Sequence, residues 1–446
     1  MKAISLFSGQ GGLDVGFENA GFEILHAIES NKFACETLRE NRRIANLNPS
    51  EFGEWFSKLM NQRCYKSWSE TDRTLLRRRL ERGVGRSTHF RFTNVIESDI
   101  RNVDAQNLLE VSKLRSGDLD LIIGGPPCQT FSRSGKRQSV NDERGQLFLD
   151  FARFVSAFRP RWFVLENVKG ITITKTDVPH GHCKSCGSDF FPTFSEYLDS
   201  RELTGVATCP HCRSVDCEVK AKADVRGGAA DIIVNEFERL GYRCHVGLLN
   251  AVHFGAPQSR ERFFIVGSRD NEPFAFPTGG FGTGGDHATL FDDLKPVRTV
   301  WDALFSEPNP YHHPDVDRTS SVLWVKNVVR PHDEPVTWSL NRPAPTIGAH
   351  QSAKLAIAPF GVPEEQLFRQ QWHTLGRRQG DTSPVFVEHS YLSDEDLLKL
   401  QTFPDYWFVA GTRMERAFQI GNAVPPALAT AMGEGVVAAG NYLRAA

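Results

Sequence analysis

The chain has 446 residues, of which 40% are hydrophobic and 24% charged, and its formal net charge is −2. This length allows a large core and suggests two domains with insertions. No apolar run approaches the ~18 residues that cross a membrane, and the first residues lack the pattern of a signal peptide, so we expect a cytoplasmic protein without a membrane partner. Nine cysteines, four of them in two CxxC pairs, favour thiolate and metal chemistry over a disulfide framework.

A glycine-rich loop follows the first expected strand, Lys2–Leu6, and reads FSGQGGLDVGF over residues 7–17. Such a loop lets backbone amides approach a cofactor closely. The second expected strand, residues 23–28, ends at Glu29, and a carboxylate there suits the two hydroxyls of a ribose. A dinucleotide fingerprint would need Gly or Ala at position 14, where this chain has Asp14. The pattern therefore favours an adenosine ligand without a pyrophosphate, or else a plain tight turn.

The third expected strand, residues 94–98, is closed by Asp99 and Ile100. In a doubly wound sheet this strand lies beside the second, so its carboxyl end could meet an adenine. Asp99 could equally serve only as the N-cap of a helix.

Two further strands end in groups that suit catalysis. The apolar run at residues 121–124 breaks at GGPP, and the rigid turn presents Cys128 at the strand's carboxyl end. After a helix-like segment, residues 146–158, the strand at residues 162–165 ends in Glu166. Neighbouring strand ends lie about 5 Å apart, so the thiol and the carboxylate could act on one small substrate.

In their order along the chain, these residues resemble the DNA (cytosine-5) methyltransferase family. The resemblance rests on Glu29, Asp99 and the blocks FSGQGG (7–12), GPPCQ (125–129), RGQLF (144–148), ENV (166–168), QSRER (258–262), RPAPT (342–346) and GNAVPP (421–426). It implies S-adenosylmethionine as the methyl donor and double-stranded DNA as the substrate. It also implies an α/β fold, with a Rossmann-like class I methyltransferase sheet covered by helices on both faces, and a smaller, loop-rich target-recognition domain.

The chemistry explains the residue types in the implied active site. A Cys128 thiolate added to C6 of a flipped cytosine would make C5 nucleophilic, while Glu166 would bind N3 and the N4 amino group. Arg260 and Arg262 alternate along an expected strand at residues 258–267, so both should point to one face. The resemblance assigns one of them to the covalent adduct and the other to organising the site, and a plain ion pair is the alternative.

The resemblance also implies the cofactor contacts. Phe7 would stack on adenine, Glu29 would bind the ribose, and Asp99 with Ile100 would hold the adenine edge. The remaining contacts would line the methionine end or complete the pocket; they are Gly9, Gly11, Leu13, Pro126, Leu147, Asn422 and Val424. The last two follow from the C-terminal block, so the final helix should return to the first domain.

A polar loop adjoins the expected nucleophile at residues 129–144. It could close behind a flipped base and contact DNA, or be a solvated surface loop. The candidate DNA-binding residues are Gln129, Ser132, Arg133, Lys136 and Arg137.

Two insertions interrupt the family pattern. Residues 50–95 carry ten Lys/Arg against five Asp/Glu and include a helical, basic stretch at residues 74–82, which either contacts phosphates or solvates a surface helix. Residues 172–225 hold two CxxC knuckles with the spacing of a closed structural zinc site. The expected ligands are Cys183, Cys186, Cys209 and Cys212, with His180, His182, His211 and Cys217 nearby.

We expect a catalytic domain at residues 1–270, a target-recognition domain at 271–405 and a returning C-terminal segment at 406–446. The middle region is rich in glycine and proline, so loop-rich structure is expected there. Residues 391–404 resemble the family's helix before its last block, with Thr402 in place of a usual glycine. We expect a bacterial, nucleoid-associated enzyme that acts as a monomer on DNA, in restriction-modification or phage defence with cognate restriction or defence proteins. The alternatives are an RNA cytosine-5 methyltransferase and a catalytically silent DNA-binding homologue.

Overall fold

The computed structural model describes residues 1–66, 68–85, 89–127, 147–192, 208–282, 294–305, 322–325, 337–348, 354–357 and 388–441. Within these ranges no helix has the length and apolar composition needed to cross a membrane.

A seven-stranded sheet forms the centre of the molecule, with strand order β3-β2-β1-β4-β5-β10-β9. Neighbours from β3 to β5 pair in parallel, whereas β10 runs antiparallel to both β5 and β9. The strands are β1 (Lys2–Leu6), β2 (Glu23–Glu29), β3 (Asn94–Glu97), β4 (Leu121–Gly124), β5 (Trp162–Val168), β9 (Arg243–Asn250) and β10 (Glu261–Ser268). The expected α/β sheet is confirmed, and its topology puts the carboxyl ends of β1, β2, β4 and β5 along one edge.

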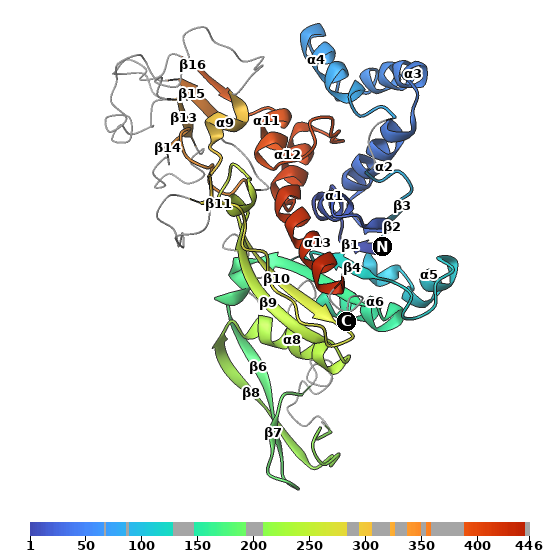
Figure 1. Cartoon of the computed structure of the whole chain (residues 1–446), viewed down its shortest axis with the longest axis vertical. Helices are drawn as coiled ribbons and strands as arrows, with labels where there is room; N and C mark the ends of the chain where they lie inside the picture. The colour runs from blue at the N-terminus through green and yellow to red at the C-terminus, as the bar shows by residue number, and fades with distance from the viewer. Residues whose placement is uncertain are drawn as a thin grey trace.

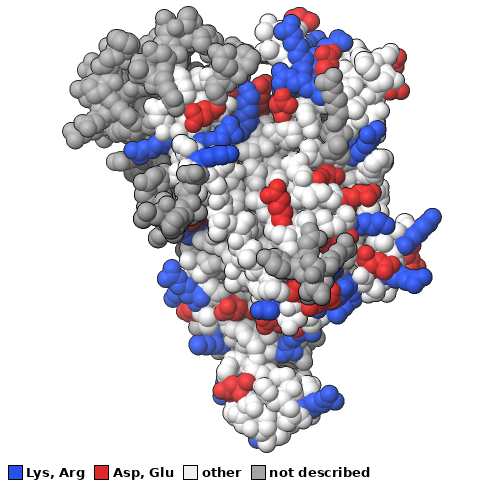
Figure 2. Space-filling model, in the orientation of Figure 1, with Lys and Arg blue, Asp and Glu red and all other residues white. Residues whose placement is uncertain are grey.

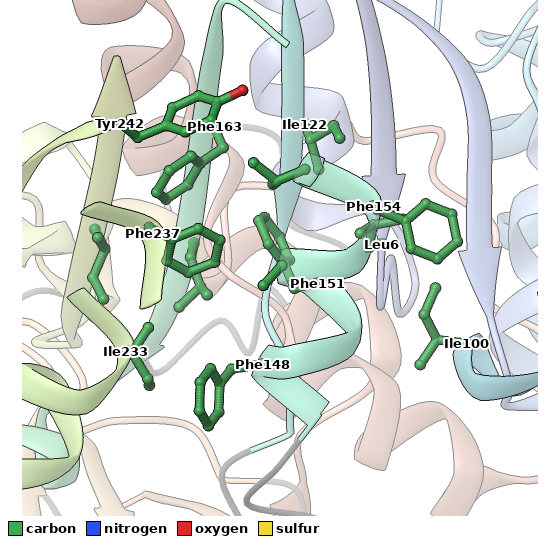
Figure 3. Packing of buried hydrophobic residues seen from close by; sticks show 14 of the residues in the cluster. Leu6, Ile100, Ile122, Phe148, Phe151, Phe154, Phe163, Ile233, Phe237 and Tyr242 are labelled. Carbon is green, nitrogen blue, oxygen red and sulfur yellow. The ribbon is translucent and has the colours of Figure 1, made fainter. Parts of the chain in front are cut away.

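Helices cover both faces of this sheet. On one face α5 (Ala105–Val111), α6 (Leu147–Phe158) and α8 (Gly228–Arg239) bury an aromatic-rich cluster, in which Phe151 packs against Phe163 and Phe237 (Figure 3). On the other face α1 (Gly12–Asn19) and α13 (Pro426–Asn441) pack on each other and on the sheet. A Cβ on Gly16 would lie 2.3 Å from Ala429 Cβ, so glycine permits this close helix contact.

A third cluster joins α1 and α2 (Lys32–Asn46) to segments from late in the chain. These are α9 (Val300–Leu304), α11 (Asp394–Leu400) and α12 (Arg413–Asn422); in Figure 1 α11 lies between α9 and α12. The fold therefore depends on contacts between its first hundred residues and segments from residue 300 onwards.

The region expected to be loop-rich also holds a small antiparallel sheet, of order β14-β13-β15-β16. It lies at the opposite end of the molecule from the cysteine-bearing hairpin, which is formed by β6 (Lys175–Cys183) and β8 (Cys217–Arg226) (Figure 1). Its strands are β13 (Val322–Val325), β14 (Thr337–Ser339), β15 (Lys354–Ile357) and β16 (Glu388–Tyr391). A two-stranded pair, β11 (Phe281–Gly282) and β12 (Lys295–Pro296), precedes it. Strands of two to four residues are too short to show an alternating pattern, which is why the sequence did not reveal them.

Candidate active site

The glycine-rich loop lies between the end of β1 and the start of α1. Phe7 and Gly9 adopt left-handed φ values of 56° and 55°, and a Cβ on Gly9 would meet open space. Glu29, at the end of β2, accepts hydrogen bonds from the backbone amides of Gly9 (2.9 Å) and Asn31 (2.7 Å). The loop is thus fastened to the carboxylate that was expected to bind a ribose, with room beside Gly9 for a ligand.

Asp99 serves as the N-cap of the short helix η1 (Ile100–Asn102). Its carboxylate accepts a hydrogen bond from the Arg101 backbone amide (3.0 Å) and pairs with the Arg101 guanidinium (2.7 Å). Hydrogen bonding from Arg101 holds the pKa of this carboxyl at about 2. Ile100 is buried in the core, and its carbonyl accepts a hydrogen bond from Arg153. The capping alternative is therefore realised, and adenine binding by Asp99 stays a prediction.

The C-terminal block reaches the glycine loop. A Cβ on Gly12 would lie 2.2 Å from the Val424 carbonyl oxygen, and Val424 shares a buried cluster with Leu13. Asn422 is exposed at the end of α12. Pro126 is buried after β4, and Leu147 packs on the aromatic cluster at the start of α6. The predicted cofactor residues thus surround the carboxyl edge of the sheet.

Glu166 lies against the turn that leads to the expected nucleophile. A Cβ on Gly125 would be 2.7 Å from Glu166 Oε2, so a larger residue there would displace the Glu166 carboxylate. Arg262 Nε contacts Glu166 Oε1 at 2.7 Å, and both side chains are nearly buried. Burial raises the pKa of Glu166, while Arg262 and Arg260 oppose the shift. A buried carboxyl with a raised pKa beside a fixed cation suits a group that binds a ring nitrogen.

Arg260 differs from its expected placement. The strand expected from residue 258 begins only at Glu261, because residues 257–259 hydrogen-bond instead to Ala344 in the RPAPT block. The buried Arg260 guanidinium donates to the carbonyls of Ile347 and Gly421, each at 2.8 Å. Arg260 thus connects the QSRER block to the residue that follows the RPAPT block and to the first residue of the GNAVPP block. Arg262 instead forms the ion pair with Glu166. The two arginines therefore have separate partners.

Several predicted residues lie outside the described ranges. They are the nucleophile Cys128 and the candidate DNA contacts Gln129, Ser132, Arg133, Lys136 and Arg137. Their roles stay predictions. The described residues that lead to this segment are β4, Gly125, Pro126 and Pro127, and Gly125 lies against Glu166.

The family described as C-5 cytosine-specific DNA methylase matches residues 1–54, 87–183 and 221–438. The chain belongs to this family. It is therefore a DNA cytosine-5 methyltransferase by descent, and the resemblance drawn from its sequence blocks is confirmed.

The methyltransferase has relatives over most of its length. It is 32% identical to the Type II methyltransferase M.AquIA of Picosynechococcus sp. over 310 residues, which cover 69% of this chain and 89% of the relative. It is 25% identical to M.NgoPII of Neisseria gonorrhoeae over 96% of this chain and 93% of the relative. A crystal structure of a Spodoptera frugiperda DNMT2 mutant shares the fold, with a TM-score of 0.51 and 14% identity over 98% of this chain and 99% of that one.

Both interruptions of the methylase match, residues 55–86 and 184–220, fall in the predicted insertions. The first holds the second half of α3 (Pro49–Met60) and all of α4 (Glu70–Glu81). Figure 2 shows Lys and Arg side chains gathered over α4. However, Arg79 is buried and donates to the Asp405 and Trp407 carbonyls, Arg82 pairs with Asp405, and Arg77 pairs with Glu81. These arginines bind the insertion to itself and to the segment before α12. Their contacts favour a structural role for them over contacts to DNA phosphates.

The second insertion projects from the body as a hairpin of β6 (Lys175–Cys183) and β8 (Cys217–Arg226), with the short β7 (Asp189–Phe190) beside it (Figure 1). At its tip the ligand atoms of the four predicted cysteines lie within 4.8 Å of one another. Of the nearby side chains, His182 bonds to Asp189 (2.7 Å), whereas Cys217 Sγ contacts the Ser214 carbonyl (3.4 Å) and packs against the cluster that holds Cys183 and Cys209. Four converging thiols fit a tetrahedral zinc ion.

Sequence reasoning missed a set of buried polar side chains behind the site. Gln258 donates to Gln401 (2.9 Å) and accepts from the Ile347 amide (3.2 Å). These bonds hold the segment that carries Arg260 and leads into β10, where Arg262 lies. Gln10 and Asp14 are buried under the glycine loop. Asp14 is a charged residue in the first turn of α1, at a position where a dinucleotide fingerprint has a small residue, and this was the available signal.

Proposed function

We propose that this methyltransferase transfers a methyl group from S-adenosylmethionine to C5 of a flipped cytosine in duplex DNA, through a transient bond between Cys128 and C6. The observation that carries the proposal is the contact of Glu166 with both Gly125 and Arg262. It supports a carboxyl, steadied by a cation, that lies against Gly125, and Gly125 precedes Cys128 by three residues in the chain. The enzyme would extrude the base because its ring is inaccessible inside a duplex.

Three residues of the chain would have separate roles in the reaction. Glu166 would bind N3 and the N4 amino group as charge builds on the ring, and Arg262 would keep the carboxyl oriented. Arg260 would hold the start of β10 against the GNAVPP block, because its guanidinium donates to the carbonyls of both Ile347 and Gly421. No described side chain is placed to remove the C5 proton, so we assign this step to water or hydroxide.

The cofactor site would form on the glycine loop, since the open space beside Gly9 and the fixed Glu29 carboxylate fit an adenosine ligand. Bound S-adenosylmethionine would supply an electrophilic methyl on a sulfonium. Phe7, Gly11, Leu13, Asp99, Ile100, Pro126, Leu147, Asn422 and Val424 would complete the pocket. The four cysteines would hold a structural zinc ion that folds the hairpin tip and takes no part in catalysis.

We further propose that residues 271–405 recognise the target sequence and that the enzyme acts as a monomer on DNA. Its Type II relatives support a role in a bacterial restriction-modification or phage-defence system, with a cognate restriction or defence protein. Bisulfite sequencing of DNA from cells that express the chain should reveal one modified sequence context. Random or absent modification would contradict this assignment.

A trapping experiment tests the mechanism. The protein is incubated with S-adenosylmethionine and duplex DNA or RNA that contains 5-fluorocytosine, which blocks the final proton loss. We expect a covalent complex with DNA that survives denaturation and that Cys128→Ser abolishes. Trapping of RNA alone would replace DNA as the substrate, and no trapping on duplexes of diverse sequence would favour a silent homologue.

A further inference from the structure

A group of buried polar side chains lies beneath the glycine loop, at the point where β1 passes into α1. Gln10 in the loop and Asp14 in the first turn of α1 are 1% and 0% exposed. Ser5, at the end of β1, and Ser8 are also buried, and Ser8 donates to Ser5 Oγ at 2.8 Å. The roles proposed above leave these four side chains unused.

The Gln10 amide is an exception to the usual pairing of buried polar groups. Among the residues that the structure describes, neither its nitrogen nor its oxygen has a hydrogen-bond partner. A buried group left unpaired costs about 1–3 kcal/mol, and such a cost calls for an explanation such as a ligand or ion. Because Gln10 belongs to the loop that faces the open space beside Gly9, a ligand of that loop is the natural partner.

Asp14 lies in acidic and apolar surroundings. The charged groups that act on it are Glu29, at the end of β2, and Glu18, one turn further along α1. The neighbouring segments contribute Leu38 and Phe90 against Gly11, and the Val424 backbone against Gly12. Burial raises the pKa of Asp14 to about 7, and the nearby Glu29 adds to the shift. Among the residues that the structure describes, neither carboxylate oxygen of Asp14 has a hydrogen-bond partner. No Lys or Arg in the described part of the chain offsets this carboxylate.

We infer that Asp14, together with Gln10, matches the positive charge of the cofactor's methionine end, and that cofactor binding expels the Asp14 proton into solvent. S-adenosylmethionine carries an ammonium and a sulfonium, and a cation near a carboxyl favours its ionised form. No bond to the cofactor is made or broken, and the only product is one solvated proton. The inference deepens the proposed function and rests on it.

The direction of the pH dependence follows from the site. Below pH 7 the carboxyl of the free protein is protonated, so binding must release a proton, and the affinity for S-adenosylmethionine should rise by up to about tenfold per pH unit as pH increases towards 7. Well above pH 7 the carboxyl is already ionised, so it releases no proton on binding and the rise in affinity should end.

Calorimetry measures the released proton without any turnover. Titrating S-adenosylmethionine into the full chain at pH 6.5, in two buffers of different ionisation enthalpy, gives the number of protons released per cofactor bound. We expect up to one proton at pH 6.5 and almost none at pH 8.5. S-adenosylhomocysteine, which lacks the sulfonium charge, should release fewer.

Two variants locate the proton. Asp14→Asn should abolish the release and flatten the pH dependence, whereas Glu18→Gln, which alters another buried carboxyl on the same helix, should retain both. Wild-type binding at pH 6.5 without proton release would overturn the inference even if Asp14→Asn fails to fold. Equal release by wild type and Asp14→Asn would also overturn it, while a wild type that binds no cofactor would contradict the proposed function itself.

Discussion

Thr402 occupies a left-handed backbone conformation, with φ of 63°, directly after the C-cap of α11. A β-branched residue is strained there, and a glycine would not be. The sequence marked this position as a departure from the family's glycine, although it could not show what compensates. In the structure Thr402 Oγ1 accepts a hydrogen bond from the Ala427 amide at 3.0 Å, so the side chain links the turn to the start of α13.

Substitutions at Thr402 should separate strain from hydrogen bonding. Thr402→Ala keeps the strained backbone and loses the bond to Ala427, so the free energy of unfolding should fall by about 1 kcal/mol. Thr402→Gly loses the same bond and relieves a strain of about 1–2 kcal/mol, so it should be close to wild type. Chemical denaturation of both variants measures this difference. An alanine variant as stable as the glycine variant would contradict the account.

Single residues at the carboxyl edge of the sheet were predictable because strand ends impose their position. Glu29 and Glu166 lie where alternating apolar runs stop, and the structure places both at that edge. Arg260 was harder, since its partners are the backbone carbonyls of Ile347 and Gly421, from segments distant in sequence. Every residue has a backbone carbonyl, so the sequence cannot indicate which carbonyls Arg260 binds.

Among the elements, the cysteine-bearing hairpin has two separate packing regions. Near its base, Val178 packs in the main core, where a Cβ on Gly228 of α8 would lie 2.3 Å from the valine side chain. Its tip has a cluster of its own, formed by Cys183, Cys209, Phe190 and Val219. So small a cluster gives little stability alone, and a metal ion at the four thiols would supply the rest.

Removal of zinc should therefore unfold the tip and leave the central sheet intact. We expect one zinc ion per chain by elemental analysis, and its loss in Cys186→Ser. Limited proteolysis of that variant should cut between residues 184 and 216, while far-ultraviolet circular dichroism stays close to wild type.

Cys217→Ser is the matched control, since this thiol contacts the Ser214 carbonyl and lies outside the four-cysteine cluster. It should retain zinc and resist the protease. Loss of zinc from Cys217→Ser, or its retention by Cys186→Ser, would contradict the proposed ligand set.

The sequence predicted the larger elements well because their signals are local. The expected strand Lys2–Leu6 has the bounds of β1, and the helix expected at residues 146–158 differs from α6 by one residue. The edge strand β9 and the sheet β13–β16 were not anticipated, because the burial of β9 is irregular and the latter strands are short. The presence of the hairpin followed from its cysteines, but its two long strands did not.

At the scale of the whole molecule, Arg260 connects regions that lie 87 and 161 residues away from it in the sequence. Its guanidinium is buried, and burial lowers its pKa well below the usual value, with Arg262 adding to the effect and Glu166 opposing it. Its two carbonyl partners have no access to water as substitutes. The side chain therefore stabilises the junction of the sheet with the returning C-terminal segment.

Arg260→Met should lower the free energy of unfolding by about 3 kcal/mol, because it leaves two buried carbonyls without a charged donor. It should also weaken cofactor binding, since Gly421 precedes the residues that close the glycine loop. Arg39→Met, which removes an exposed pair with Glu97, should cost under about 1 kcal/mol. Denaturation curves and cofactor titrations measure both effects, and equal losses in the two variants would contradict the role of Arg260.

The contact between Gly12 and the Val424 carbonyl has a consequence for biosynthesis. The proposed cofactor pocket takes one wall from the segment around Gly12 and the other from the segment around Val424, so a nascent polypeptide has no complete pocket until residue 424 has been synthesised. A premature stop codon before position 424 would yield a product unable to hold the methyl donor. The cell would thus be spared DNA modification by unfinished copies of this enzyme.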